Sequence, residues 1–263
     1  MVRKSIKNIK DQKKDKKITC LTAYTTSIAK IIDGHVDMIL IGDSLGTTIY
    51  GMKNTQGVTL EMMMNHGRAV VNSTKNAFTI IDLPYNTYRN KKEALLNAKK
   101  LLKFTKCQSV KLEINNKNIE IVRHLVKNKI DVISHIGVTP QKFKNFNKIR
   151  SVGNSALDIN RIFNLALKLE EAGSSMLFLE CMKETLAKKI SNVLKIPTIG
   201  IGASLDCDGQ VLVINDILNM ENLKKKPKFI KSYIKLNSII DKAVEGFCKE
   251  VVNKKFPKKE NTY

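Results

Sequence analysis

Five short apolar runs that end in polar residues constrain the fold of this chain more than any other feature. The run from Met38 to Gly42 is uninterrupted, as in a strand buried on both faces of a parallel sheet under helices. Because the carboxyl ends of parallel strands meet at one edge of a sheet, we expect these polar ends to gather and form the active site. The runs are Met38–Asp43, Thr79–Asp82, Val110–Glu113, Val132–His135 and Leu177–Glu180.

The number of strands predicts a barrel. Three further candidates, Ile18–Tyr24, Pro197–Gly202 and Gln210–Asn215, raise the number to eight, and helical segments separate nearly all of them. This alternation predicts an α/β fold, a single-domain (βα)8 TIM barrel. The interval from Ala203 to Gly209 is too short for a full helix, so a doubly wound open sheet stays an alternative.

The domain limits follow from composition. We predict a basic polar leader over residues 1–17, a catalytic barrel over 18–252 and a charged tail over 253–263. The leader lacks the apolar core of a signal peptide, and no apolar run approaches the roughly 18 residues that a membrane helix needs. We therefore expect a cytoplasmic protein that does not enter a membrane.

The net charge of +22 raises the question of nucleic-acid binding. The lysines are spread along the whole chain, however, and the sequence has no Trp for base stacking and no zinc-finger spacing. We expect no specific binding to nucleic acid. A basic binding protein that keeps the barrel but has lost its activity is the alternative of a different class.

Three carboxylates are expected at the mouth of the barrel, from neighbouring strands. Asp43, Asp82 and Glu113 would repel one another unless a cation neutralised them, and carboxylate oxygens favour Mg²⁺ over transition metals. A single Asp at a strand end is often only a helix cap or a loop acceptor, but three on adjacent strands favour a metal site. A 2-oxo acid can occupy two positions on such an ion.

Three other side chains are expected to act on the substrate. Glu180 lies across the predicted barrel from the carboxylates, where it can remove a proton from the carbon beside a carbonyl; its alternative is a salt bridge to a lysine. Lys111 can offset the charge of the substrate or the enolate, or it is an ordinary surface lysine. His135 is the only histidine at a predicted strand end, and we expect it to hydrogen-bond the substrate.

At these residues the sequence resembles the ketopantoate hydroxymethyltransferase family. The resemblance runs from about residue 18 to 219 and consists of many ordered blocks, which makes it specific. The blocks include Leu21–Tyr24, Ile41–Gly46, Asp82–Pro84, Val110–Glu113, Ser134–Gln141, Leu169–Gly173, Phe178–Cys181, Ile196–Ala203 and Asp208–Val213.

The resemblance implies residue roles. Asp43 and Asp82 match positions that bind Mg²⁺, and Glu113 matches one that binds it through water. Ser44 and Lys111 match substrate-binding positions, and Glu180 matches the catalytic base. With the derivation above, the expected substrate-binding set is Asp43, Ser44, Asp82, Lys111 and His135.

The reaction implied is transfer of a hydroxymethyl group from 5,10-methylenetetrahydrofolate to 3-methyl-2-oxobutanoate, in pantothenate biosynthesis. The oxo acid is deprotonated at C3, and the enolate attacks the one-carbon unit to give 2-dehydropantoate and tetrahydrofolate. The resemblance also implies a cytoplasmic homo-oligomer, commonly a decamer, whose partners are the small 2-oxo acid and folate.

The chain departs from the family pattern at several positions that are neither metal ligands nor the base: Thr25, Asn115-Asn116, Met182-Lys183, Ser204 and Asn215. A rival interpretation is another barrel enzyme that acts on 2-oxo acids, in the isocitrate lyase and phosphoenolpyruvate mutase group. The Lys-Lys-Cys-Gly-His loop of that group is absent from this sequence.

Overall fold

Eight parallel strands close into a barrel in the computed structural model of the chain, which describes residues 3–13, 15–146, 149–221 and 226–263. Strands adjacent in sequence are adjacent in the sheet, and the last pairs with the first. The barrel prediction is confirmed, and the open-sheet alternative is wrong. The strands are β1 (Ile18–Thr22), β2 (Met38–Ile41), β3 (Phe78–Asp82), β4 (Ser109–Glu113), β5 (Val132–Gly137), β6 (Met176–Glu180), β7 (Thr198–Ile201) and β8 (Gly209–Leu212).

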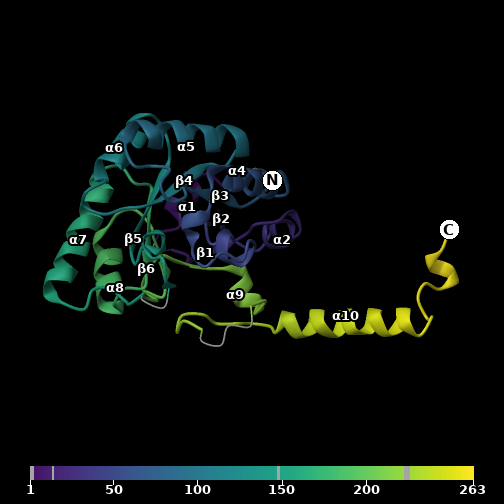
Figure 1. Cartoon of the computed structure of the whole chain (residues 1–263). Coiled ribbons are helices and arrows are strands. Elements are labelled where there is room, and N and C mark those ends of the chain that lie inside the picture. The colour runs from purple at the N-terminus through teal and green to yellow at the C-terminus, as the bar shows by residue number, and fades with distance from the viewer. Residues whose placement is uncertain (1–2, 14, 147–148, 222–225) are drawn as a thin grey trace. The chain divides into compact units, whose positions relative to one another are not determined.

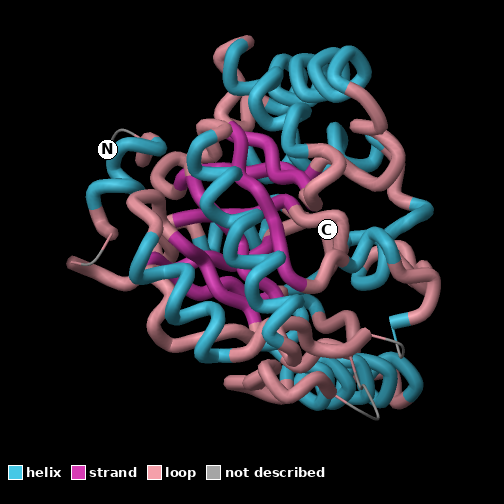
Figure 2. Tube along the Cα trace, turned by 90° about the vertical axis from the view of Figure 1, so that its left-hand side faces the viewer, coloured by secondary structure: helices cyan, strands magenta, loops and turns pink. Residues whose placement is uncertain are grey.

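Helices surround the strands, as Figures 1 and 2 show. They begin at polar residues that satisfy free amide groups: Thr59 caps α4, Asn90 caps α5 and Ser155 caps α7. At the start of α7, the Ser155 hydroxyl accepts from the Asp158 amide, and the helix begins at Ala156. The helices with the barrel are α1 (Ile6–Asp11), α2 (Thr26–Ile32), α3 (Leu45–Thr48), α4 (Leu60–Asn72), α5 (Lys91–Thr105), α6 (Ile119–Lys127), α7 (Ala156–Glu171) and α8 (Glu184–Val193), with 3₁₀ turns at Thr55–Gly57 and Pro140–Lys142.

The barrel closes between β7 and β8 without an intervening helix. Ile199 pairs with Gly209 and Gly200 with Gln210, so the short connection still joins parallel strands. A Cβ atom at Gly209 would lie 2.4 Å from the backbone oxygen of Ile18 on β1. Glycine therefore allows β8 to approach β1 closely enough to complete the barrel.

The first helix packs against the barrel although the sequence predicted only a polar leader there. Ser5 and Asn8 form a capping box for α1. Ile9 is fully buried in the same hydrophobic cluster as Ile18, Met38 and other residues at the beginnings of strands. The amino-terminal end of the barrel is thus covered by α1.

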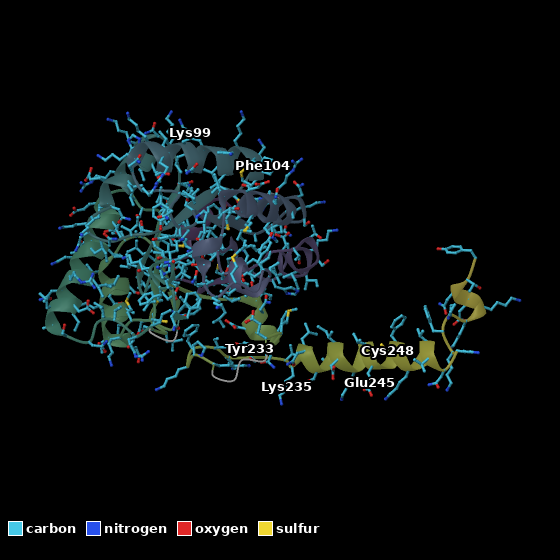
Figure 3. The ribbon with its side chains drawn as sticks, viewed as in Figure 1. Lys99, Phe104, Tyr233, Lys235, Glu245 and Cys248 are labelled. Carbon is cyan, nitrogen blue, oxygen red and sulfur yellow. The ribbon has the colours of Figure 1, made fainter. Side chains whose placement is uncertain are left out.

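Contacts divide the chain into two compact units, Met1–Val213 with the barrel and Ile214–Tyr263. The predicted domain limits at residues 18 and 252 stay a prediction. The second unit contains α9 (Ile214–Leu218), α10 (Leu236–Val252) and a 3₁₀ turn at Lys259–Asn261. None of the α10 residues is buried; Figure 3 labels Glu245 and Cys248 on this helix. In the described residues, no helix is both long and apolar enough to cross a membrane.

Candidate active site

The predicted carboxylates come together at the carboxyl ends of β2, β3 and β4. Asp43 follows β2, Asp82 ends β3 and Glu113 ends β4. In the parallel register Asp82 pairs with Lys111, and Glu113 pairs with His135. All five residues are at most 8% exposed. The strand geometry therefore gathers five ionisable groups at one buried edge.

Lys111 lies inside the barrel. Its Nζ is 2.6 Å from Asp82 Oδ1 in an ion pair and 5.9 Å from the centre of the Phe178 ring. The second oxygen of Asp82 accepts a hydrogen bond from the Asp43 amide at 3.0 Å. The alternative that Lys111 is a surface lysine is wrong, because its side chain is only 7% exposed.

Gln141, in the loop after β5, links two of the carboxylates. Its side-chain Nε2 donates to Asp43 Oδ2 at 2.7 Å, and its backbone amide donates to Glu113 Oε1 at 3.1 Å. The same Nε2 reaches the backbone oxygen of Leu83 at 3.0 Å, and Oε1 accepts from the Tyr88 hydroxyl. Gln141 thereby fixes the positions of carboxylates from β2 and β4.

The carboxylates outnumber the cations around them. Burial, followed by the nearby charge of Asp82, raises the pKa of Asp43 to about 7. Burial and then the charge of Asp43 raise the pKa of Glu113 well above its usual range. Burial alone would lower the pKa of Lys111, but Asp82 and Asp43 outweigh it and the pKa rises. The cluster thus has an excess of negative charge when its carboxylates are ionised.

This donor set fits a hard divalent cation. Glu113 Oε2 is buried and has no hydrogen-bond partner among the described residues. Carboxylate oxygens are the ligands that Mg²⁺ prefers, and a cation would relieve the repulsion that raises the carboxyl pKa values. As the side chains stand, no group of three or more His, Cys, Asp or Glu residues in the described ranges is arranged to hold a metal ion. Lys111 and Gln141 engage oxygens of Asp82 and Asp43 in this arrangement.

Glu180 and His135 form the other part of the site. In the barrel order, β6 with Glu180 lies four strands from β2 with Asp43, on the opposite side of the mouth. His135 Nε2 is 3.3 Å from Glu180 Oε2, and neither ring nitrogen makes a hydrogen bond of good geometry to a described residue. The Glu180 side chain is 17% exposed, more than the 5% of His135.

Ser44 is held beside the cluster by Tyr24, which follows β1. The two hydroxyl oxygens are 2.8 Å apart. Burial raises the pKa of Tyr24 to about 12, against the opposing effect of the hydrogen bond with Ser44. The Ser44 hydroxyl therefore has a fixed neutral partner next to Asp43.

Two residues of the site, Gln141 and Tyr88, had no role in the sequence-based prediction. Burial and then the charge of Glu113 raise the pKa of Tyr88 well above its usual value, so its hydroxyl is a donor to Gln141. The available signal was the position of Gln141, which directly follows Thr139-Pro140 in the turn after a predicted strand. An uncharged amide in a loop is too common for that signal to have indicated a role.

The structure gives several departures from the family pattern a local partner. Thr25 accepts a hydrogen bond from the Ile28 amide and caps α2. Asn115 bonds Asn118 through its backbone, and the Ser204 hydroxyl accepts from the backbone of the same turn. Met182 is 3% exposed. These substitutions are accommodated by contacts within the barrel unit.

Solved structures with a similar fold have little sequence in common with the chain. Phosphonopyruvate hydrolase, solved in complex with oxalate and Mg²⁺, gives a TM-score of 0.64 at 10% identity and covers 99% of this chain and 93% of its own. A 2,3-dimethylmalate lyase of the PEP mutase/isocitrate lyase superfamily gives 0.61 at 12% identity, covering 100% and 93%. These likenesses support the barrel fold.

Sequence relatives show the family. The protein named 3-methyl-2-oxobutanoate hydroxymethyltransferase from Pelagibacter ubique (strain HTCC1062) is 44% identical over 260 residues, 99% of both chains. The protein of the same name from Rhizobium etli is 41% identical and covers 97% of this chain and 93% of its own. The model of the ketopantoate hydroxymethyltransferase family matches residues 3–259. The chain therefore belongs to the ketopantoate hydroxymethyltransferase family, enzymes that transfer a hydroxymethyl group to 3-methyl-2-oxobutanoate.

Proposed function

We propose that the chain uses Mg²⁺ and 5,10-methylenetetrahydrofolate to convert 3-methyl-2-oxobutanoate into 2-dehydropantoate. The observation that carries this proposal is the buried carboxylate cluster of β2 to β4 facing Glu180 on β6. A cation at the cluster and a base on the opposite side are what enolate formation from a 2-oxo acid requires. Membership of the family supports the oxo acid as the substrate, and the carboxylate cluster supports Mg²⁺ as the metal.

Asp43 and Asp82 would hold Mg²⁺ directly, and Glu113 through water. When bound, the ion supplies positive charge that polarises the 2-oxo group and stabilises the enolate. Lys111, which is already in the cluster, adds a second positive charge near the carboxylate of the substrate. The Ser44 hydroxyl, which bonds the Tyr24 hydroxyl, would hydrogen-bond the same substrate.

Glu180 acts as the base that removes the proton from C3 of the oxo acid. The electron pair of the broken C–H bond moves into the enolate, and His135 next to Glu180 hydrogen-bonds the substrate. The enolate carbon then forms a bond with the one-carbon unit, and the two bonds of that carbon to the folate nitrogens break. One water supplies the hydroxyl group to the carbon and its proton to one nitrogen, and Glu180 returns its proton to the other, so that the products are 2-dehydropantoate and tetrahydrofolate.

Deuterium exchange tests the first half of this reaction without folate. In deuterated water, the purified protein should exchange the C3 proton of 3-methyl-2-oxobutanoate in the presence of Mg²⁺, as followed by NMR. Glu180→Gln should reduce the exchange rate by at least about a hundredfold, because a neutral amide cannot accept the proton. Asp82→Ala should weaken the Mg²⁺-dependent binding of the oxo acid and so raise the concentration of oxo acid needed.

Glu171→Gln is the matched control, because Glu171 is exposed at the end of α7. It should exchange at the rate of the unaltered protein. Exchange that persists in Glu180→Gln, or that does not depend on Mg²⁺, would contradict the proposed roles. Consumption of 5,10-methylenetetrahydrofolate with formation of 2-dehydropantoate tests the second half.

The proposal includes a cytoplasmic homo-oligomer that does not bind nucleic acid specifically. The support for an oligomer is α10, where apolar side chains recur at helical spacing and are exposed: Ile240, Val244, Phe247 and Val251. A stripe of this kind is expected to contact another protein surface. Light scattering after gel filtration should give a mass of several chains, ten by the family resemblance, and Phe247→Lys should lower it.

A further inference from the structure

A cavity of about 190 Å³ adjoins the carboxylate cluster. Its walls come from the loop between β3 and α5 and the loop between β4 and α6, together with Gln141 and Lys142. Tyr85 and Tyr88 supply aromatic surface, and Asn115 and Asn118 supply amide groups. None of the roles described so far for the oxo acid uses this cavity.

The cavity and the cluster have two residues in common. Glu113 is a member of the cluster and also lines the cavity. Gln141 lines the cavity too, and it donates hydrogen bonds to Asp43 and Glu113 of the cluster. Tyr88 lines the cavity and donates its hydroxyl to Gln141. A molecule in the cavity would therefore lie directly beside the place where the enolate forms.

The loops around the cavity are held in place by their own hydrogen bonds. Asn118 accepts from the Asn115 amide at 2.7 Å and donates to the backbone oxygen of Glu113 at 3.3 Å. Asn97 of α5 donates to the backbone oxygen of Thr87 at 2.7 Å. A cavity whose walls are ordered in advance loses less entropy when it binds a ligand.

We propose that this cavity binds the pterin ring of the one-carbon donor, which rests on the proposed function. The volume is below the 300–1,000 Å³ typical of sites that enclose a whole drug-sized ligand, so only one ring system of a folate would be enclosed. A flat heterocycle with polar edges suits tyrosine rings next to asparagine amides. The remaining aminobenzoyl-glutamate part would extend outward.

The charge at the outer rim agrees with this orientation. Lys142 and Arg89 line the cavity and are exposed, so they lie at its solvent side. The guanidinium of Arg89 is fixed by Glu93 at 2.7 Å, which leaves Lys142 as the freer cation of the two. The glutamate tail of a folate is anionic, and each added glutamate increases its attraction to a lysine at the rim.

The test compares folate binding with proton exchange in single variants of the full chain. Tetrahydrofolate is titrated by calorimetry in the presence of Mg²⁺ and oxo acid, and C3 exchange is measured without folate. Tyr85→Ala should weaken tetrahydrofolate binding by about tenfold or more, because an aromatic wall is lost. Exchange should stay within about twofold of the unaltered protein, since no atom of Tyr85 is needed for proton removal.

Lys142→Ala provides an independent variant at an exposed position, where folding is not at risk. It should weaken binding of a triglutamyl tetrahydrofolate more than binding of the monoglutamate. Tyr50→Ala is the matched control: Tyr50 is a tyrosine in the loop region after β2, 45% exposed, and does not line the cavity. It should bind both folates normally.

Two results would overturn the proposal. Unchanged tetrahydrofolate affinity in both Tyr85→Ala and Lys142→Ala would place the donor elsewhere, and loss of affinity in Tyr50→Ala alone would indicate the loop after β2. Loss of exchange along with folate binding in folded Tyr85→Ala would assign the cavity to the oxo acid instead. An absence of Mg²⁺-dependent exchange in the unaltered protein would refute the proposed function separately, because the exchange rate and the folate affinity are measured in independent experiments.

Discussion

Replacing Gln141 by Leu removes the side chain that connects the carboxylate cluster. Leucine keeps the approximate volume and the backbone bond to Glu113, but it loses three side-chain hydrogen bonds. These are the bonds to Asp43, to the backbone oxygen of Leu83 and from the Tyr88 hydroxyl. The change therefore leaves polar groups without partners at a buried position.

The expected cost follows from those three groups. A buried acceptor that loses its partner costs about 1–3 kcal/mol, with the higher values for charged groups such as the Asp43 carboxylate. Tyr88 borders the cavity, where its hydroxyl can bond water instead, so its share is small. We expect a total loss of about 3–4 kcal/mol in the free energy of unfolding, or about 10 °C in Tm for a chain of this size.

Gln108→Leu is the matched control, because Gln108 is also a bridging amide but lies at the other end of β4. Its Oε1 accepts from the Thr79 amide at 3.1 Å, and its Nε2 donates to the backbone oxygen of Lys4 at 2.8 Å. Both variants should lose stability in urea denaturation. Only Gln141→Leu should also slow Mg²⁺-dependent exchange of the C3 proton, because only Gln141 orients a carboxylate of the site.

Two outcomes would refute this reasoning. A change below about 0.5 kcal/mol in Gln141→Leu would mean that the buried groups find other partners. Equal effects of the two variants on exchange would mean that activity follows stability alone.

Three further predictions concern stability. Gly137→Ala should be among the most destabilising small substitutions, because φ is +102° and the added Cβ would lie 2.2 Å from a backbone oxygen of β6. Gly246→Ala in α10 should instead stabilise its helix by up to about 1 kcal/mol, since the added Cβ would have no atom within 4 Å. Denaturation of both variants tests this contrast. Lys13→Met should cost about 3–5 kcal/mol by leaving Asp208 buried without its ion pair at 2.5 Å, and thermal unfolding should show it. The pKa of Asp37 is held at about 2, since its hydrogen bonds and its lysine partner outweigh burial; stability should therefore fall as the pH drops from about 4 towards 2, and Asp37→Asn should flatten that dependence.

The strands were predictable because a parallel barrel buries both faces of each strand. The expected runs Val110–Glu113 and Leu177–Glu180 end where β4 and β6 end, and each strand begins one residue earlier, at Ser109 and Met176. Their polar ends were also predictable, since strand direction alone brings Glu113 and Glu180 to the same edge. The sequence did not decide between a closed barrel and an open sheet, because closure depends on a close backbone approach at Gly209 that no periodicity reveals.

Tertiary contacts account for what the sequence did not predict. The segment before α10 follows a contact with α9, in which the Tyr233 amide donates to the backbone oxygen of Ile217, and α10 begins at Leu236. The role of Gln141 depends on three partners that are distant in sequence, so no local pattern indicated it.

The contact between Lys13 and Asp208 has a consequence for the order of folding. The two residues are 195 positions apart, yet they close the same end of the barrel beneath α1. During synthesis, Lys13 leaves the ribosome long before Asp208 has been made. Lys13 therefore has no ion-pair partner until the last strand has been made, and a nascent chain that stops before Asp208 should be cut more readily by proteases near Lys13 than the complete chain.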